Sequence, residues 1–310
     1  MRFAVESWAP EYGAPSDEEA LLAESTSEVD AFAEVGPEGW RPLDPAPTVA
    51  APDRLLFVDG VRRVEATVWI TGADEVHQGL CASYAAGVVC CDGQARLVGA
   101  EVKRSLLCAA DGAEPIVTRH GPFGVEVAAA HEPRDLTLLL QARMARLEVA
   151  VAAAHRGDAP LVVVDGPLRD GHDEAGLVGF VKTHRSAYGP PVVRETVARL
   201  GVGQRTPLLL LGSVRNRWSW YLRLPCTVDH GWAGIVRLEL RADRPVAEAA
   251  ALADGLARAL PRFASVPQKD PRAPQNLVPV GGLERDLRRR LGDPALLYRA
   301  LREAAARSAA

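Results

Sequence analysis

Two short apolar runs that end in Asp-Gly constrain the fold of this chain more than any other feature. Residues 55–60 read LLFVDG and residues 161–166 read LVVVDG. A short, continuous apolar run with β-branched residues is typical of a strand buried on both faces, as in the parallel sheets of α/β proteins. Asp-Gly is common turn chemistry, but two carboxylates at neighbouring strand ends can also bind a metal ion. Both interpretations stay open on these two runs alone.

The segments around the two runs predict an α/β protein built on a mixed sheet. Residues 54–108 contain strand-like segments that are bounded by Gly or Asp-Gly, which predicts an antiparallel meander of three to four strands. Within it, alternation places four residues on one face: Val64, Ala66, Val68 and Ile70. Residues 132–157 predict a long helix, and the LVVVDG run then follows as a buried parallel strand. The helix has a continuous apolar stripe at Leu136, Leu140, Met144, Leu147 and Val151.

The remaining third of the chain continues the same alternation of helices and strands. Helices are predicted over residues 190–203, 245–263 and 279–308, the last as one or two helices. Strands are predicted in residues 205–213, 217–225 and 234–242.

Composition bounds the class of protein. The 310 residues are 48% apolar and 25% charged, which is ordinary for a globular protein. No apolar run of about 18 residues predicts a membrane span, and no secretory signal pattern is recognisable, so we expect a cytoplasmic protein. The five cysteines form no C-x-x-C pair, which favours buried reduced thiols over a zinc site or a disulfide framework.

The charge is unevenly distributed along the chain. Residues 1–50 hold eleven acidic and two basic residues, so residues 51–310 carry about +5, with 34 basic against 29 acidic residues. We interpret residues 1–50 as an acidic, Pro/Gly-rich arm and linker, with a candidate helix over residues 16–34, and residues 51–310 as the main domain. A mildly basic body is compatible with a nucleic-acid partner. An acidic arm that occupies a basic groove and regulates access of DNA is one hypothesis for the first segment.

Three acidic residues fall where they can meet. Asp59 and Asp165 end strands that can lie side by side, about 4.8 Å apart, in a mixed sheet. Glu148 follows Met144 by one helical turn and therefore lies at the edge of the buried stripe, where an ionised carboxylate needs a partner. A metal ion is one such partner, and Arg143 or Arg146 is the other. Strand, helix and strand carboxylates form the layout of the ribonuclease H-like fold, where they hold two divalent ions.

The order of these motifs resembles that of the NurA nucleases, ribonuclease H-like DNA nucleases that work with the HerA hexameric ATPase. The segments that carry the resemblance are LLFVDGVRR (55–63), ARLEVAVAAA (145–154), LVVVDGPL (161–168), GFVKTHR (179–185) and APQNLVPVGGLE (273–284). The resemblance implies a ribonuclease H-like mixed sheet flanked by helices and a DNA nuclease activity. It also implies a HerA-like ATPase partner and a homodimer.

By the same resemblance, Asp59, Glu148 and Asp165 would bind Mn²⁺ or Mg²⁺, with two ions expected. Lys182 would bind the scissile phosphate as a compact cation, and His184 is a weaker candidate. The family's histidine near the C-terminus is missing, because no histidine follows His230. We therefore consider three residues as its substitute: Gln275, Asn276 or Glu284.

One predicted strand carries candidate substrate-binding residues. Alternation places four residues on one face, namely Arg215, Arg217, Tyr221 and Arg223, and places Trp218, Trp220 and Leu222 on the other. Arginines beside an aromatic side chain on an open face suit phosphate contact and base stacking. No P-loop motif occurs, so any ATPase motor would be another chain. The alternative function is a ribonuclease H-like DNA-binding or scaffold module without catalysis, for which both Asp-Gly pairs would be turn residues only.

Overall fold

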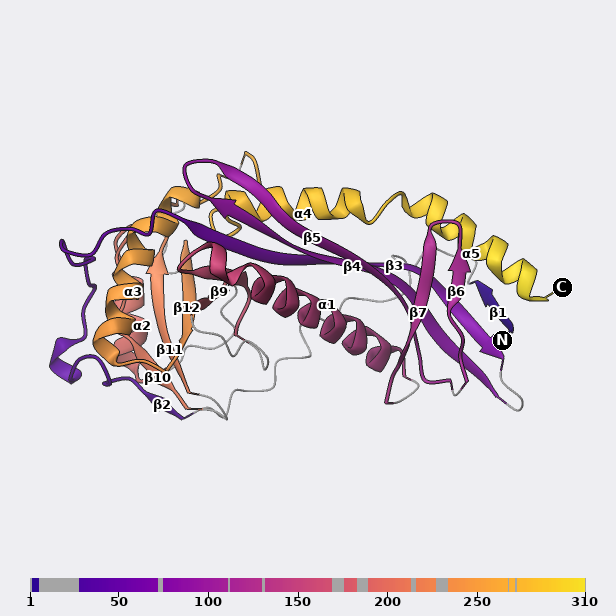
Figure 1. Ribbon diagram of the computed structural model, residues 1–310. Helices are drawn as coiled ribbons and strands as arrows, with labels where there is room; N and C mark the ends of the chain where they lie inside the picture. The colour runs from indigo at the N-terminus through magenta and orange to yellow at the C-terminus, as the bar shows by residue number, and fades with distance from the viewer. Residues whose placement is uncertain are drawn as a thin grey trace.

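Figure 1 shows the chain in a computed structural model as a long mixed sheet with helices on both faces. The structure describes residues 2–5, 28–71, 75–110, 112–129, 132–168, 176–182, 189–212, 216–226, 234–266, 268–270 and 272–309. The helices are α1 (Pro133–His155), α2 (Pro191–Ala198), α3 (Val246–Ala259), α4 (Val278–Arg290) and α5 (Pro294–Ala309). Short 3₁₀ helices are η3 (Pro37–Gly39), η4 (Arg156–Asp158) and η5 (Leu260–Phe263).

The strands of the described residues join one twelve-stranded sheet. They are β1 (Arg2–Val5), β2 (Val29–Asp30), β3 (Leu55–Thr71), β4 (Val76–Cys91), β5 (Ala95–Cys108), β6 (Ile116–Thr118), β7 (Gly121–Val127), β8 (Val162–Asp165), β9 (Leu177–Val181), β10 (Leu209–Leu211), β11 (Arg217–Arg223) and β12 (Ile235–Arg241). Their order is β2-β10-β11-β12-β9-β8-β3-β4-β5-β7-β6, and β1 pairs with the far end of β3.

The centre of the sheet has the predicted arrangement of strands. β3, β4 and β5 form an antiparallel meander, β8 lies parallel beside β3, and β9 lies parallel beside β8. Alternate residues of β3 enter two different cores, because successive side chains of a strand point to opposite faces. Phe57 packs in the core that includes α3 and α4, whereas Val58 packs in the core that includes α1. The predicted mixed sheet flanked by helices is therefore confirmed.

A β-bulge interrupts the regular alternation of β3. The pairing with β4 shifts between Val64 and Ala66, because a bulge sets two residues against one on the partner strand. Ala66 and the apolar residues beyond it pack towards α5, whereas Val64 packs against the α1 core. The prediction that Val64 shares one face with these residues is therefore wrong.

The acidic N-terminal segment joins the sheet at its edge. β2 pairs with β10, where the candidate helix over residues 16–34 was expected, so that prediction is wrong for Val29 and Asp30. Residues 16–27 lie outside the described residues. Trp40 is buried and donates from its indole Nε1 to the Ala31 carbonyl oxygen at 2.8 Å. Residues 28–50 thus pack on the main body.

A second anchor of this segment is a buried ion pair. Glu34 accepts two hydrogen bonds from the Arg205 guanidinium at 2.9 and 3.0 Å, and Asp254 of α3 accepts a third at 2.6 Å. Arg205 is only 3% exposed. At least one acidic residue of the segment therefore neutralises a buried cation and is unavailable for covering a groove.

None of the helices that the structure describes has the length and apolar character of a membrane span.

Candidate metal centre

Sheet register brings the two Asp-Gly aspartates together. β3 and β8 pair in parallel from Leu56 opposite Val162 to Val58 opposite Val164. Asp59 and Asp165 are the next residues of each strand, so their side chains project on the same face, beside each other. That face is the one covered by α4, since Phe57 and Val163 pack there.

The two Asp-Gly pairs nevertheless have different backbone roles. Asp165 is the last residue of β8, and Gly166 follows with φ +102°, a conformation that favours glycine. Asp59, in contrast, lies inside β3, which continues to Thr71. The prediction that a strand ends at Asp59 is therefore wrong.

Gly60 is required by close packing of a helix rather than by a turn. A Cβ atom at residue 60 would lie 2.5 Å from Glu148 Oε1 and 3.1 Å from Met144 Cγ, both on α1. It would also lie 3.2 Å from the Ala85 carbonyl oxygen of β4. The helix therefore approaches the sheet at the one position of β3 where no side chain intervenes, and this approach places Glu148 on the α1 side of the sheet.

We expect Gly60→Ala to destabilise the protein by about 1–3 kcal/mol, as overpacking of a filled interior does. Urea denaturation measures the change in the free energy of unfolding. Gly124→Ala in β7 is the matched control, because nothing lies within 4 Å of a Cβ there. The control should be neutral or gain up to about 1 kcal/mol. Equal effects of the two substitutions would contradict the close approach of α1.

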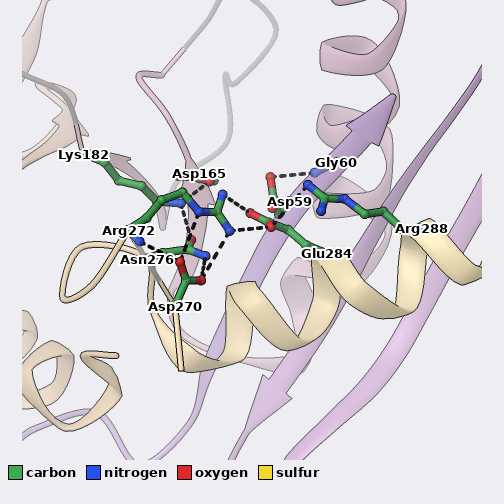
Figure 2. Close-up of polar contacts among 9 residues, drawn as sticks. All are labelled: Asp59, Gly60, Asp165, Lys182, Asp270, Arg272, Asn276, Glu284 and Arg288. Atoms are coloured by element: carbon green, nitrogen blue, oxygen red, sulfur yellow. Dashed lines mark hydrogen bonds and ion pairs between the residues drawn. The ribbon is translucent and has the colours of Figure 1, made fainter. Parts of the chain in front are cut away.

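Three carboxylates converge on one space, as Figure 2 shows. Asp59, Asp165 and Glu284 each offer an oxygen, and these oxygens lie within 4.8 Å of one another. Glu284 comes from α4, which packs through Leu283 and Leu287 on the same face of the sheet. We name Asp59, Asp165 and Glu284 the acidic cluster.

The third member of the acidic cluster differs from the predicted one. Glu148 is buried on the α1 side of the sheet and is not among these three residues, whereas Glu284 is, so the role of Glu148 as a metal ligand stays a prediction. Its charge still contributes to raising the pKa of Asp59, together with larger effects described below. Among the considered substitutes for the missing histidine, Glu284 is thus the one that offers a third carboxylate.

Basic side chains contact two members of the acidic cluster, Asp165 and Glu284. Lys182, next after β9, donates from Nζ to Asp165 Oδ2 at 2.5 Å and to Asn276 Oδ1 at 2.7 Å. Arg272 donates to both oxygens of Glu284 at 2.9 and 2.7 Å, and Arg288 Nη2 lies 3.8 Å from Glu284 Oε2. Figure 2 shows these cations arranged around the carboxylates.

The buried amide of Asn276 connects Lys182 with Asp270, which in turn contacts Arg272. Asn276 is fully buried, accepts from Lys182 and donates from Nδ2 to Asp270 Oδ2 at 2.6 Å. Asp270 Oδ1 accepts from the backbone N–H of Arg272 at 2.8 Å. Sequence reasoning missed Asp270 and Arg272, because nothing in DPRAPQN (270–276) before a helix distinguishes them from ordinary loop residues.

The electrostatics of the acidic cluster favour a bound cation. Burial raises the pKa of Asp59 well above its ordinary value, and the neighbouring Asp165 raises it further. Burial also acts to raise the pKa of Glu284, but hydrogen bonds from Arg272 outweigh it and leave that pKa lowered. Ionised Asp59 thus lacks sufficient compensation from Lys182 alone.

The donor set fits a hard divalent cation. Carboxylate oxygens are the ligands that Mg²⁺ and Mn²⁺ prefer, and a divalent ion would compensate the buried charge of Asp59. Asp59, Asp165 and Glu284 are the residues that would hold it. The three carboxylates come from two strands and a later helix, in the order β3, β8 and α4, and not in the predicted order of strand, helix and strand.

The predicted substrate-binding strand is only partly open. Trp218, Trp220 and Leu222 of β11 enter the core as predicted. Tyr221, however, is 1% exposed, so the prediction that it lies on an open face is wrong.

The reason is that other elements cover this face, since Ala31, Trp40 and residues of α2 pack in the same cluster as Tyr221. Arg217 and Arg223 are half-buried at the two ends of β11, and Arg217 pairs with Glu239 at 3.2 Å. Arg215 and His184 lie outside the described residues.

Comparisons with known proteins find similarity of the backbone to solved structures. No family model and no curated protein matches the chain. Solved structures similar to it include the crystal structure of the NurA nuclease from Sulfolobus solfataricus, at 11% identity and a TM-score of 0.47. The alignment covers 81% of this chain and 84% of that chain.

Proposed function

We propose that this chain is a divalent-metal-dependent DNA nuclease that hydrolyses phosphodiester bonds. The observation that carries the proposal is the acidic cluster, in which three carboxylates converge within 4.8 Å and one of them, Asp59, is buried with a raised pKa. Such carboxylates hold Mg²⁺ or Mn²⁺ in enzymes that cut phosphodiesters, where the ions activate water and stabilise the leaving oxygen.

The residues around the acidic cluster suit such a substrate. Lys182 lies against Asp165 and would contact the scissile phosphate as a compact cation. Arg217 and Arg223 of β11, with Arg215, would contact the DNA backbone further along. The meander of β3 to β5, with β8 parallel to β3 and β9 parallel to β8, supports the proposal, because the sequence resemblance implies a mixed sheet flanked by helices.

The partners and assembly are proposed from that resemblance alone. A HerA-like hexameric ATPase would feed DNA to the nuclease, and a homodimer would fit such a ring. The role would be DNA end processing or repair.

A catalytically inactive DNA-binding or scaffold module is the second candidate. Arg272 favours it, because a bidentate guanidinium already neutralises Glu284. In that case the arginine replaces a metal ion, and the acidic cluster only stabilises the contact between α4 and the sheet.

The test is cleavage of end-labelled single- and double-stranded DNA with Mn²⁺, Mg²⁺ or EDTA. We expect cleavage with either ion and none with EDTA. Thermal unfolding with and without Mn²⁺ accompanies it, because an ion that binds the folded state raises its stability by mass action. A Mn²⁺ shift without cleavage would indicate a missing motor. Absence of both would contradict the proposed nuclease and favour the inactive module.

A further inference from the structure

Two solvent-exposed arginines contact the acidic cluster through Glu284. Arg272 is 51% exposed and Arg288 is 66% exposed in their side chains, whereas Glu284, which both contact, is only 8% exposed. Arginine carries five N–H donors. Arg272 uses its donors on Glu284 and, at 3.3 Å from both Nε and Nη2, on Asp270, although half of its side chain stays in solvent. Any molecule that approaches Glu284 from solvent therefore meets these two side chains.

Arg272 and a metal ion compete for the same carboxylate. Arg272 donates to both oxygens of Glu284, so a divalent ion on this carboxylate would face a positive charge at hydrogen-bond distance. Metal binding at Glu284 thus favours release of the guanidinium. Released from Glu284, Arg272 keeps its contacts of 3.3 Å with Asp270 and frees the two donors that Glu284 held. Another anion can take these donors, and the guanidinium fork matches phosphate as well as carboxylate.

The surroundings keep Arg272 at the site after such a release. Its backbone N–H is held by Asp270 Oδ1 at 2.8 Å, and Asp270 is held in turn by the buried Asn276. Asn276 also accepts from Lys182, so one buried amide fixes the positions of both cations relative to Asp165 and Glu284. The exchange therefore involves the end of the Arg272 side chain and no displacement of its backbone.

We propose that Arg272 and Arg288 form a phosphate-binding site for the nucleic-acid backbone and that Arg272 exchanges between Glu284, without metal, and substrate phosphate, with metal. The inference rests on the proposed function and adds to it a site outside Lys182 and the β11 arginines. It also gives the bidentate Arg272–Glu284 contact a role in metal-dependent substrate binding. The thermodynamic consequence is cooperativity, because metal and phosphate each favour the state that binds the other.

The test uses the full-length protein and the variant Arg272→Gln, with two readouts. Calorimetric titration with Mn²⁺ alone should show affinity increased by about tenfold, within the usual range of couplings between ligands, because a competing cation is gone. Binding of a short labelled single-stranded oligonucleotide in Ca²⁺, with its integrity checked on a gel, should weaken. The slope of log affinity against log salt should fall by about 0.7 for the one lost phosphate contact.

Two further variants keep the result interpretable. Arg290→Gln is the control, since Arg290 lies on α4, as Glu284 and Arg288 do, but pairs with Asp286 at 2.6 Å, and both affinities should stay unchanged. Arg272→Lys keeps the charge without the fork, so it should retain the salt slope and lose the bidentate contact to Glu284.

Each other outcome overturns the inference. Tighter Mn²⁺ binding with unchanged DNA binding and salt slope would show that Arg272 only neutralises Glu284. Unchanged or weaker Mn²⁺ binding would show that it does not compete with the metal. A wild-type protein that binds no Mn²⁺ would contradict the proposed function as well, whereas the first two results leave the metal centre intact.

Discussion

Asp165→Asn is expected to reduce metal-dependent DNA cleavage by about a hundredfold to a thousandfold, the usual loss when one stabiliser of developing charge is removed. Asparagine keeps the shape of the side chain but removes a negative ligand from the acidic cluster. It also leaves Lys182 without the carboxylate that its Nζ contacts at 2.5 Å. Both effects act on the reaction and only weakly on the fold, because Asp165 is the last residue of a strand and is partly exposed.

The measurement is the initial rate of cleavage of a labelled oligonucleotide in Mn²⁺, with the Mn²⁺-induced shift in unfolding temperature beside it. Asp286→Asn is the matched control, because Asp286 lies on α4 close to Glu284 in sequence but pairs with Arg289 and Arg290. The control should cleave at the wild-type rate. If Asp165→Asn cleaves and binds Mn²⁺ as well as the control does, the two Asp-Gly pairs are structural and the inactive module is the better description.

Arg205→Met is expected to lower the free energy of unfolding by about 3–5 kcal/mol, the typical result of removing one partner of a buried ion pair. Methionine fills similar volume, so the loss is electrostatic: Glu34 and Asp254 would stay buried without their shared cation. Glu34 Oε2 also accepts from the backbone N–H of Leu208 at 2.5 Å, which fixes the carboxylate in place. Urea denaturation measures the effect.

Arg258→Met provides the comparison for this second prediction. Arg258 also contacts the N-terminal segment, donating to the Pro45 and Ala46 carbonyl oxygens at 2.9 and 3.0 Å, but it is exposed. Its loss should cost about 1 kcal/mol or less. Similar losses in the free energy of unfolding for the two variants would contradict the larger stabilisation that we assign to the buried Arg205 ion pair. Because Glu34 is part of this pair, deletion of residues 1–45 should destabilise the body.

The sequence predicted the elements of the central sheet because their apolar patterns are local. The helix over residues 132–157 and the buried run before Asp165 were identified with nearly the observed bounds, α1 and β8. The sequence analysis expected the second run to be a buried parallel strand that can lie beside the first, and β8 does pair in parallel with β3. Asp59 and Asp165 therefore lie together as predicted.

The errors arose where distant segments decide the local structure. Asp-Gly at residues 59–60 gives the signal of a turn, but the close approach of α1 makes glycine necessary inside a continuous strand. Tyr221 alternates with core residues and was expected to be exposed, but residues of the N-terminal segment and α2 cover it. Sequence periodicity describes the two faces of a strand and contains no information on what packs on either face.

The choice of the third carboxylate shows the same limit. Glu148 and Glu284 both lie on helices beside apolar stripes, and Glu148 was the expected member because it lies between the two Asp-Gly runs in the sequence. The structure resolves the choice because α4 docks on the face that Asp59 and Asp165 share, whereas α1 docks on the opposite face.

The acidic cluster draws its members from almost the whole length of the chain, since Asp59 lies in β3 and Glu284 in the helix next to last. Chains emerge from the ribosome N-terminus first, and contacts between residues far apart in sequence form late because of the entropy of closing a long loop. A nascent or truncated chain that ends before residue 272 would contain Asp59 and Asp165 but would lack Arg272, Asn276 and Glu284. Under the proposed function, metal-dependent cleavage would therefore begin only after synthesis of α4.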